Sequence, residues 1–155
     1  MKLSVIGIGN LYAGDDGVGV RLVERLSKRR PWMDLSFLLW EDTDALTLTH
    51  DLIDLGSPVL IVDCADMGIE PGEYRWFDAR STRLKLQTDS VSTHGLGMAE
   101  AIELAQLMGF DMPVTIFGVQ PFDLSPVSYL SQLMKSRFSY LLDALEKRVI
   151  EMVVS

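Results

Sequence analysis

The sequence is poor in several features that would place it in a familiar class. One cysteine in 155 residues cannot form a disulfide within the chain. Only 14 lysines and arginines face 22 acidic residues, and a net charge of −8 lacks the basic footprint of a nucleic-acid-binding protein. No apolar run approaches the roughly 18 residues needed to cross a bilayer. Met1-Lys2 leads directly into a strand-like segment, without a signal-peptide pattern. We therefore expect a cytoplasmic protein with neither nucleic-acid nor membrane partner.

What is present favours a folded domain with a sizeable core. Hydrophobic residues make up 48% of the chain, which excludes a disordered composition. A length of 155 residues suits one domain, and no repeat, low-complexity tract or linker divides the sequence. We predict a single domain over residues 1–155.

Hydrophobic periodicity predicts strands and helices in alternation. Such alternation is typical of a three-layer α/β/α domain with a mainly parallel sheet, here of five strands. The link between the third and fourth strands has only about ten residues and no helix, so we expect the fourth strand to be antiparallel. The predicted strands are residues 3–8, 35–40, 59–62, 73–78 and 114–119, and the predicted helices are residues 17–29, 45–55, 96–108 and a long one from Val127 onward.

The turn after the first predicted strand combines glycines with two adjacent aspartates. An apolar strand that runs into glycines resembles a dinucleotide-binding turn, but Tyr12 occupies the place of the third glycine, three residues after Gly9. Asp15 and Asp16 would also lie at the helix N-terminus, where a phosphate normally binds. Two carboxylates there repel a phosphate and attract a cation. The turn therefore indicates a metal-binding or proton-transfer task.

Three candidate metal ligands are predicted at the carboxyl edge of the parallel strands, where open α/β sheets bind ligands. Asp16 lies at the start of the first crossover helix, Asp63 terminates the third strand, and His94 starts the helix that leads into the last strand. Imidazole suits nickel, zinc or copper, and carboxylates supply charged oxygen ligands. Three protein ligands leave at least one coordination position open for chemistry or for an incoming ligand.

Each of these residues also has a purely structural interpretation. Asp16 would then cap the first helix, Asp63 would end a strand, and His94 would hydrogen-bond to backbone at a helix start. Cys64 offers another alternative, because a Cys–His pair with His94 would make a cysteine peptidase. Successive side chains of a strand point to opposite faces, however, so Asp63 and Cys64 would not share a site. We therefore expect Cys64 to be structural.

Four motifs in register resemble those of the nickel–iron hydrogenase maturation endopeptidases. They cover nearly the whole chain, in the order and at the spacing typical of that family, although Tyr12 stands where an aliphatic residue is common. The motifs are Gly7-x-Gly9-Asn10 with Asp15-Asp16-Gly17-x-Gly19, then Asp63-x-x-Asp66-x-Gly68 with Pro71-Gly72, then Ser92-x-His94, and finally Gly118-Val119-Gln120-Pro121.

The resemblance implies a phosphorylase/hydrolase-like fold with a twisted sheet, and a specific task. The expected activity is removal of the C-terminal extension of the hydrogenase large-subunit precursor after that precursor has received nickel. Nickel would be presented by the substrate, and no tightly bound cofactor is expected. The implied metal ligands are Asp16, Asp63 and His94, the two aspartates being also the implied catalytic groups, and the implied loop-organising residues are Gly9, Asn10 and Asp66.

Two other functions remain open at this point. The chain would act as a non-catalytic chaperone if it binds the precursor and checks its metal loading without cutting it. It would be a nucleotide-binding enzyme if the glycine turn held a phosphate, which Tyr12 and the paired aspartates disfavour.

Overall fold

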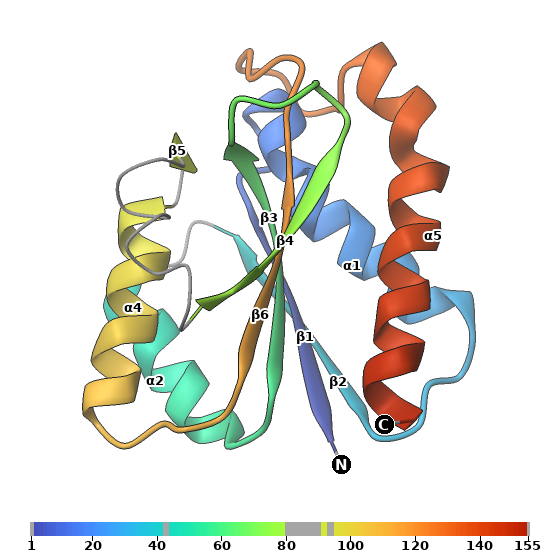
Figure 1. The fold of residues 1–155 in the computed structure, drawn as a ribbon. Helices are drawn as coiled ribbons and strands as arrows, with labels where there is room; N and C mark the ends of the chain where they lie inside the picture. Colours follow the sequence, from blue (N-terminus) through green and yellow to red (C-terminus); the bar gives the residue numbers. More distant parts are fainter. Residues whose placement is uncertain (1, 42–43, 80–90, 93–94, 155) are drawn as a thin grey trace.

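The computed structural model describes residues 2–154 except 42–43, 80–90 and 93–94. Its centre is a sheet in the order β2-β1-β3-β6-β4, in which β2, β1, β3 and β6 are parallel and β4 is antiparallel to β6 (Figure 1). The predicted mostly parallel sheet with an antiparallel fourth strand is confirmed. A two-residue strand, β5, was not predicted and pairs with the end of β3. The strands are β1 Leu3–Gly9, β2 Leu35–Glu41, β3 Val59–Asp66, β4 Tyr74–Asp78, β5 Val91–Ser92 and β6 Val114–Val119.

Helices cover both faces of the sheet, as predicted. Figure 1 shows α1 and α5 on one face and α2 and α4 on the other. No helix in the described part of the chain is long and apolar enough to cross a membrane. The helices are the 3-10 helix η1 Gly14–Gly17 and the α-helices α1 Val18–Arg29, α2 Ala45–Leu55, α4 Gly95–Leu107 and α5 Gln132–Val154.

The side chains of β3 alternate between two hydrophobic cores. Leu60 and Val62 pack against α1 and α5, whereas Val59 and Ile61 pack on the side of α2 and α4. Because a strand has a period of two, this alternation places Cys64 with the first set, as observed, and Asp63 with the second.

Local signals define α2 at both ends. The Asp44 carboxylate accepts a hydrogen bond from the backbone N–H of Thr47 at 2.8 Å, which lowers the pKa of Asp44 and caps the helix. Gly56 ends the helix with φ of 55°, a left-handed conformation that glycine adopts without strain. The predicted helix over residues 45–55 is therefore confirmed, and the structure shows a cap at each of its ends.

Two predicted boundaries were wrong by several residues, and a one-residue difference at the first helix bears on the candidate site. The third strand does not end before Asp63 but continues to Asp66, because β6 pairs with it as far as Cys64 and β5 pairs with its last two residues. The last helix begins at Gln132 rather than Val127. The first helix begins at Val18, after η1, which contains Asp16.

Candidate functional site

The side chain of Asp16 is buried within the turn between β1 and α1, where it contacts the backbone of the turn. Asp16 is 1% exposed, and its Oδ2 accepts a hydrogen bond from the N–H of Asn10 at 2.9 Å. A Cβ atom on Gly9 would lie 2.3 Å from the carbonyl oxygen of Asp16, so only glycine lets β1 approach the turn this closely. The contacts of Gly9 and Asn10 agree with the predicted loop-organising role, which stays a prediction.

Asp15 lies beside Asp16 in sequence but binds a different part of the chain. Its buried carboxylate accepts hydrogen bonds from the backbone N–H groups of Phe122, Asp123 and Ser131, at 2.8–3.0 Å, and from the Ser131 hydroxyl at 2.9 Å. Ser131 also caps α5 through the N–H of Met134. Asp15 therefore ties the turn to the segment between β6 and α5, a role that the sequence did not indicate.

Asp63 lies inside β3 rather than at its end. It is 1% exposed, is paired with Gly118 of β6 in the strand register, and accepts a hydrogen bond from the N–H of Cys64 at 2.8 Å. The N-terminus of α1 reaches the same point, because a Cβ on Gly19 would lie 2.3 Å from the carbonyl oxygen of Val62. The structure therefore places η1, which contains Asp16, in contact with β3, which contains Asp63, and a shared role of the two aspartates stays a prediction.

His94 lies outside the described residues, so its position as the third metal ligand stays a prediction. The chain on its N-terminal side is described: Ser92 pairs with Ala65, two residues after Asp63, and α4 begins at Gly95. Within the described ranges, no group of three or more His, Cys, Asp or Glu side chains is arranged to hold a metal ion.

Asp66 and Gln120 link the ends of β3 and β6. The Gln120 amide donates to Asp66 Oδ1 at 3.1 Å and accepts from the N–H of Met67 at 2.7 Å, while the N–H of Gly68 donates to the same Asp66 oxygen at 3.3 Å. These contacts agree with the predicted loop-organising role of Asp66. Sequence reasoning gave Gln120 no role, although the Gly118–Pro121 motif that contains it was a signal.

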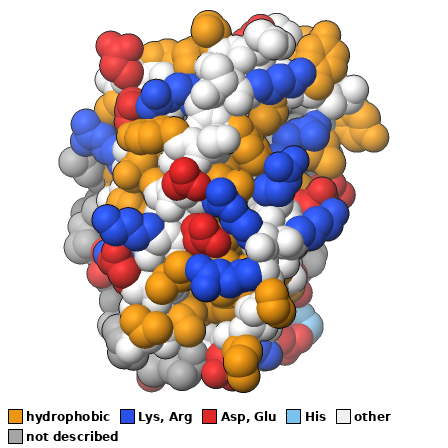
Figure 2. Space-filling view, turned by 90° about the vertical axis from the view of Figure 1, so that its right-hand side faces the viewer, with side chains coloured by type: hydrophobic (Ala, Val, Ile, Leu, Met, Phe, Trp, Pro, Cys, Tyr) orange, Lys and Arg blue, Asp and Glu red, His pale blue; other side chains and the backbone are white. Residues whose placement is uncertain are grey.

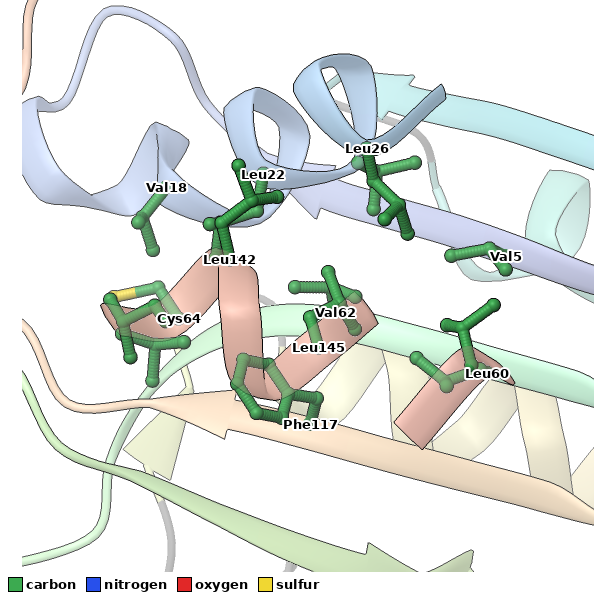
Figure 3. Close-up of a cluster of buried hydrophobic side chains, with 14 of the residues drawn as sticks. Val5, Val18, Leu22, Leu26, Leu60, Val62, Cys64, Phe117, Leu142 and Leu145 are labelled. Carbon is green, nitrogen blue, oxygen red and sulfur yellow. The ribbon is translucent and has the colours of Figure 1, made fainter. Parts of the chain in front are cut away.

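Cys64 is a buried core residue in this arrangement. It is 1% exposed and lies on the same face of β3 as Val62, facing α1 (Figure 3). Burial raises the pKa of its thiol strongly, and the nearby charges of Asp63 and Asp16 raise it further. A thiol held in its neutral form is a poor nucleophile, which supports the structural interpretation of Cys64 over the cysteine peptidase.

Two buried carboxylates at the carboxyl edge of a parallel sheet can bind a divalent cation or move a proton. Asp16 and Asp63 each receive a hydrogen bond from a backbone N–H group, which fixes the carboxylate on a rigid part of the fold. They are oxygen donors of the kind that complements an imidazole ligand. Fold and site together define an α/β protein with two buried aspartates toward the carboxyl ends of its parallel strands.

Comparison with known proteins identifies the family. The sequence model of the hydrogenase maturation proteases matches residues 20–148. The hydrogenase expression/formation protein HoxM of Cupriavidus necator is 33% identical over 144 residues, which are 92% of this chain and 69% of HoxM. The hydrogenase 2 maturation protease of Escherichia coli is 28% identical over 81% of this chain and 77% of that protein. The chain therefore belongs to the hydrogenase maturation protease family, which is a family of peptidases.

Solved structures agree with this fold. The hydrogenase maturating endopeptidase HybD from E. coli superposes with a TM-score of 0.83 at 24% identity, over 98% of this chain and 94% of that one.

The chain spans less of some curated relatives, for example 61% of the hydrogenase expression/formation protein HupD of Rhizobium leguminosarum. Asp63 and position 94 lie within the residues that the family model matches, whereas Asp16 precedes them.

Proposed function

We propose that this chain is an endopeptidase that removes the C-terminal extension of the precursor of a nickel–iron hydrogenase large subunit. Its membership of the maturation protease family carries this proposal, and the buried carboxylates of Asp16 and Asp63 at one sheet edge support it. The substrate is the nickel-loaded precursor, and its nickel is the recognition signal. The protease has no tightly bound cofactor and works in the cytoplasm.

In this mechanism the acidic edge receives the metal centre of the precursor. Asp16, Asp63 and His94 contact the nickel of the substrate and thereby hold the precursor's tail beside the same edge. Asp16 or Asp63 takes a proton from the water that attacks the scissile carbonyl. The C–N bond then breaks, and the departing amine receives the proton. The backbone hydrogen bonds to both carboxylates keep them oriented before the substrate arrives.

The deciding experiment is intact mass spectrometry of a large-subunit precursor after incubation with the protein, with and without nickel. We expect loss of one C-terminal peptide from the loaded precursor alone. An unchanged mass in a stable complex would favour the chaperone instead.

Carboxamide variants test the two aspartates. Asp16→Asn and Asp63→Asn should each slow processing about 100-fold or more, because each loses an anionic ligand or base. Asp54→Asn removes an exposed carboxylate of α2 and is the matched control, expected to process at the wild-type rate. Normal processing by either site variant would remove that aspartate from the mechanism.

A further inference from the structure

The face formed by α1 and α5 has a charge opposite to that of the whole chain. These two helices and Arg30 carry nine lysines and arginines against four acidic residues, although the net charge of the chain is −8. Figure 2, which views the molecule from the side of α5, shows Lys and Arg side chains across the face with exposed hydrophobic atoms between them.

Most cations of this face are already paired within the chain. Three of the four that form no ion pair within the described residues line one hollow, and the fourth, Lys147, lies three turns further along α5. The cations that are paired with carboxylates of the chain are Lys28, Arg29, Arg30, Arg137 and Arg148.

The hollow is a groove of about 370 Å3 between α1 and the N-terminal half of α5, and we name it the basic groove. This volume suits one or two side chains of a bound segment. Two of its cations make cation–π contacts. Lys135 Nζ lies 5.6 Å from the centre of the Tyr129 ring, and the Arg25 guanidinium lies 5.9 Å from the centre of the Phe138 ring. Its charged lining residues are Arg21, Glu24, Arg25 and Lys135, and its aromatic ones are Tyr129 and Phe138.

The basic groove adjoins the turn that carries Asp16. A Cβ on Gly17, the residue after Asp16, would lie 3.5 Å from Arg21 Nε, and Arg21 donates to the carbonyl oxygen of Ser128 at 2.9 Å. The backbone N–H of Gly14 donates to the carbonyl oxygen of Val127 at 3.0 Å. These hydrogen bonds therefore connect the turn that contains Asp16 to residues 127–128, which lead into the part of the groove lined by Tyr129.

We propose that the basic groove binds an acidic segment of the client protein, with a carboxylate between the cations and a neighbouring apolar side chain against the two rings. Three cations against one acid select an anion, and the aromatic walls favour a peptide over a bare inorganic ion. This groove engages the client beside the acidic edge and thereby orients it toward Asp16. The identity of that client rests on the proposed function.

Charge reversal at matched positions of one helix tests this docking. Lys135→Glu places an acid in the groove, whereas Lys147→Glu makes the same change on an exposed position of α5 outside it. With nickel-loaded precursor as substrate, Lys135→Glu should raise KM about fivefold or more and leave kcat within twofold, because the groove binds but takes no part in the reaction. Lys147→Glu should leave both constants near wild type.

A peptide-binding assay tests the groove independently of the peptidase activity. The probes are a fluorescent octapeptide of alternating glutamate and leucine and the same peptide with lysine for glutamate. Wild type and Lys147→Glu should bind the acidic peptide at least fivefold more tightly than Lys135→Glu, and none should bind the basic one. Urea unfolding midpoints verify that the variants are folded.

The outcomes distinguish the two proposals. Equal KM changes in both variants, or no change with Lys135→Glu, would overturn the docking role. Competition by inorganic phosphate as effective as that by the acidic peptide would overturn peptide recognition. If wild type cleaves no loaded precursor but binds the acidic peptide through Lys135, the groove stands and the proposed peptidase function fails.

Discussion

Asp15 and Asp16 are adjacent carboxylates that the fold separates into two environments. Asp15 accepts four hydrogen bonds from the segment between β6 and α5, whereas the Asp16 carboxylate is bound by the N–H of Asn10 in the turn after β1. The sequence predicted the position of Asp16 at the sheet edge. It could not reveal the partners of Asp15, because they lie more than 100 residues away and are mostly backbone groups.

The separation predicts different phenotypes for the two aspartates. Asp15→Ala leaves three backbone N–H groups without their acceptor, so we expect the free energy of unfolding to fall by roughly 3–5 kcal/mol. Urea unfolding followed by circular dichroism measures this change. Asp123→Ala removes an exposed carboxylate of the same segment that accepts hydrogen bonds only from Ser125 among the described residues, so it should lower the midpoint clearly less than Asp15→Ala. A stable Asp15→Ala protein would contradict the anchoring role.

Cys64 gives a second prediction at this scale. Because burial raises the pKa of its thiol, Cys64 should resist iodoacetamide at neutral pH in the native protein and react in urea. Cys64→Ala should process the precursor normally and lose about 1 kcal/mol of stability through lost core contacts. Rapid native alkylation, or loss of processing in Cys64→Ala, would instead restore the cysteine-peptidase alternative.

At the scale of elements, the sequence predicted best where local signals suffice. The helix over residues 45–55 has its own N-cap and its own terminal glycine, and the strand over residues 114–119 is a continuous apolar run. The third strand was predicted too short because its polar end is stabilised by β6 and β5, which no local pattern contains. The last helix was predicted to begin too early because residues just before Gln132 bind the first turn instead: the carbonyl oxygen of Val127 accepts from the N–H of Gly14, and the N–H of Ser131 donates to Asp15.

The contact between α1 and the sheet predicts a strict requirement for glycine at position 19. A Cβ there would lie 2.3 Å from the carbonyl oxygen of Val62 and 2.7 Å from that of Ile8, so Gly19→Ala should push α1 away from β1 and β3. We expect a loss of roughly 2–3 kcal/mol in the free energy of unfolding, measured in urea, and slower processing through displacement of Asp16.

Gly97→Ala is the matched control for that substitution. Gly97 lies in α4, and among the described residues beyond its own helix backbone a Cβ there meets no atom within 4 Å, so alanine should raise the stability by up to about 1 kcal/mol through its higher helix propensity. Equal effects at positions 19 and 97 would show that the close approach of α1 to the sheet is unimportant.

At the scale of the whole molecule, the candidate site and the basic groove lie at the same end of the sheet. Asp16 follows the carboxyl end of β1, Asp63 lies in the second half of β3, and the segment from β6 to α5 crosses the same end of the sheet (Figure 1). Tyr129 and Leu130 of that segment line the basic groove. The sequence predicted this edge from the alternation of strands and helices. The groove was not predictable, because it depends on how α1 and α5 pack against each other and on which cations remain unpaired.

Because the candidate site lies at the carboxyl end of the parallel strands, we expect an insertion at that end of the sheet to impair processing more than an insertion at the opposite end. Four residues, Gly-Ser-Gly-Ser, placed between Leu124 and Ser125 would lie between two hydrogen-bond partners of the turn, since the carbonyl oxygens of Asp123 and Val127 accept from the N–H groups of Asp15 and Gly14. The same insertion between Met33 and Asp34 lies in the exposed connection from α1 to β2, at the opposite end of the sheet. We expect the first insertion to reduce kcat/KM for the loaded precursor at least tenfold and the second to leave it within twofold, with both proteins folded in urea titrations. If the insertion after Met33 impaired processing as much as the one after Leu124, the reaction would not be confined to the carboxyl edge, because a remote and exposed turn would then contribute equally.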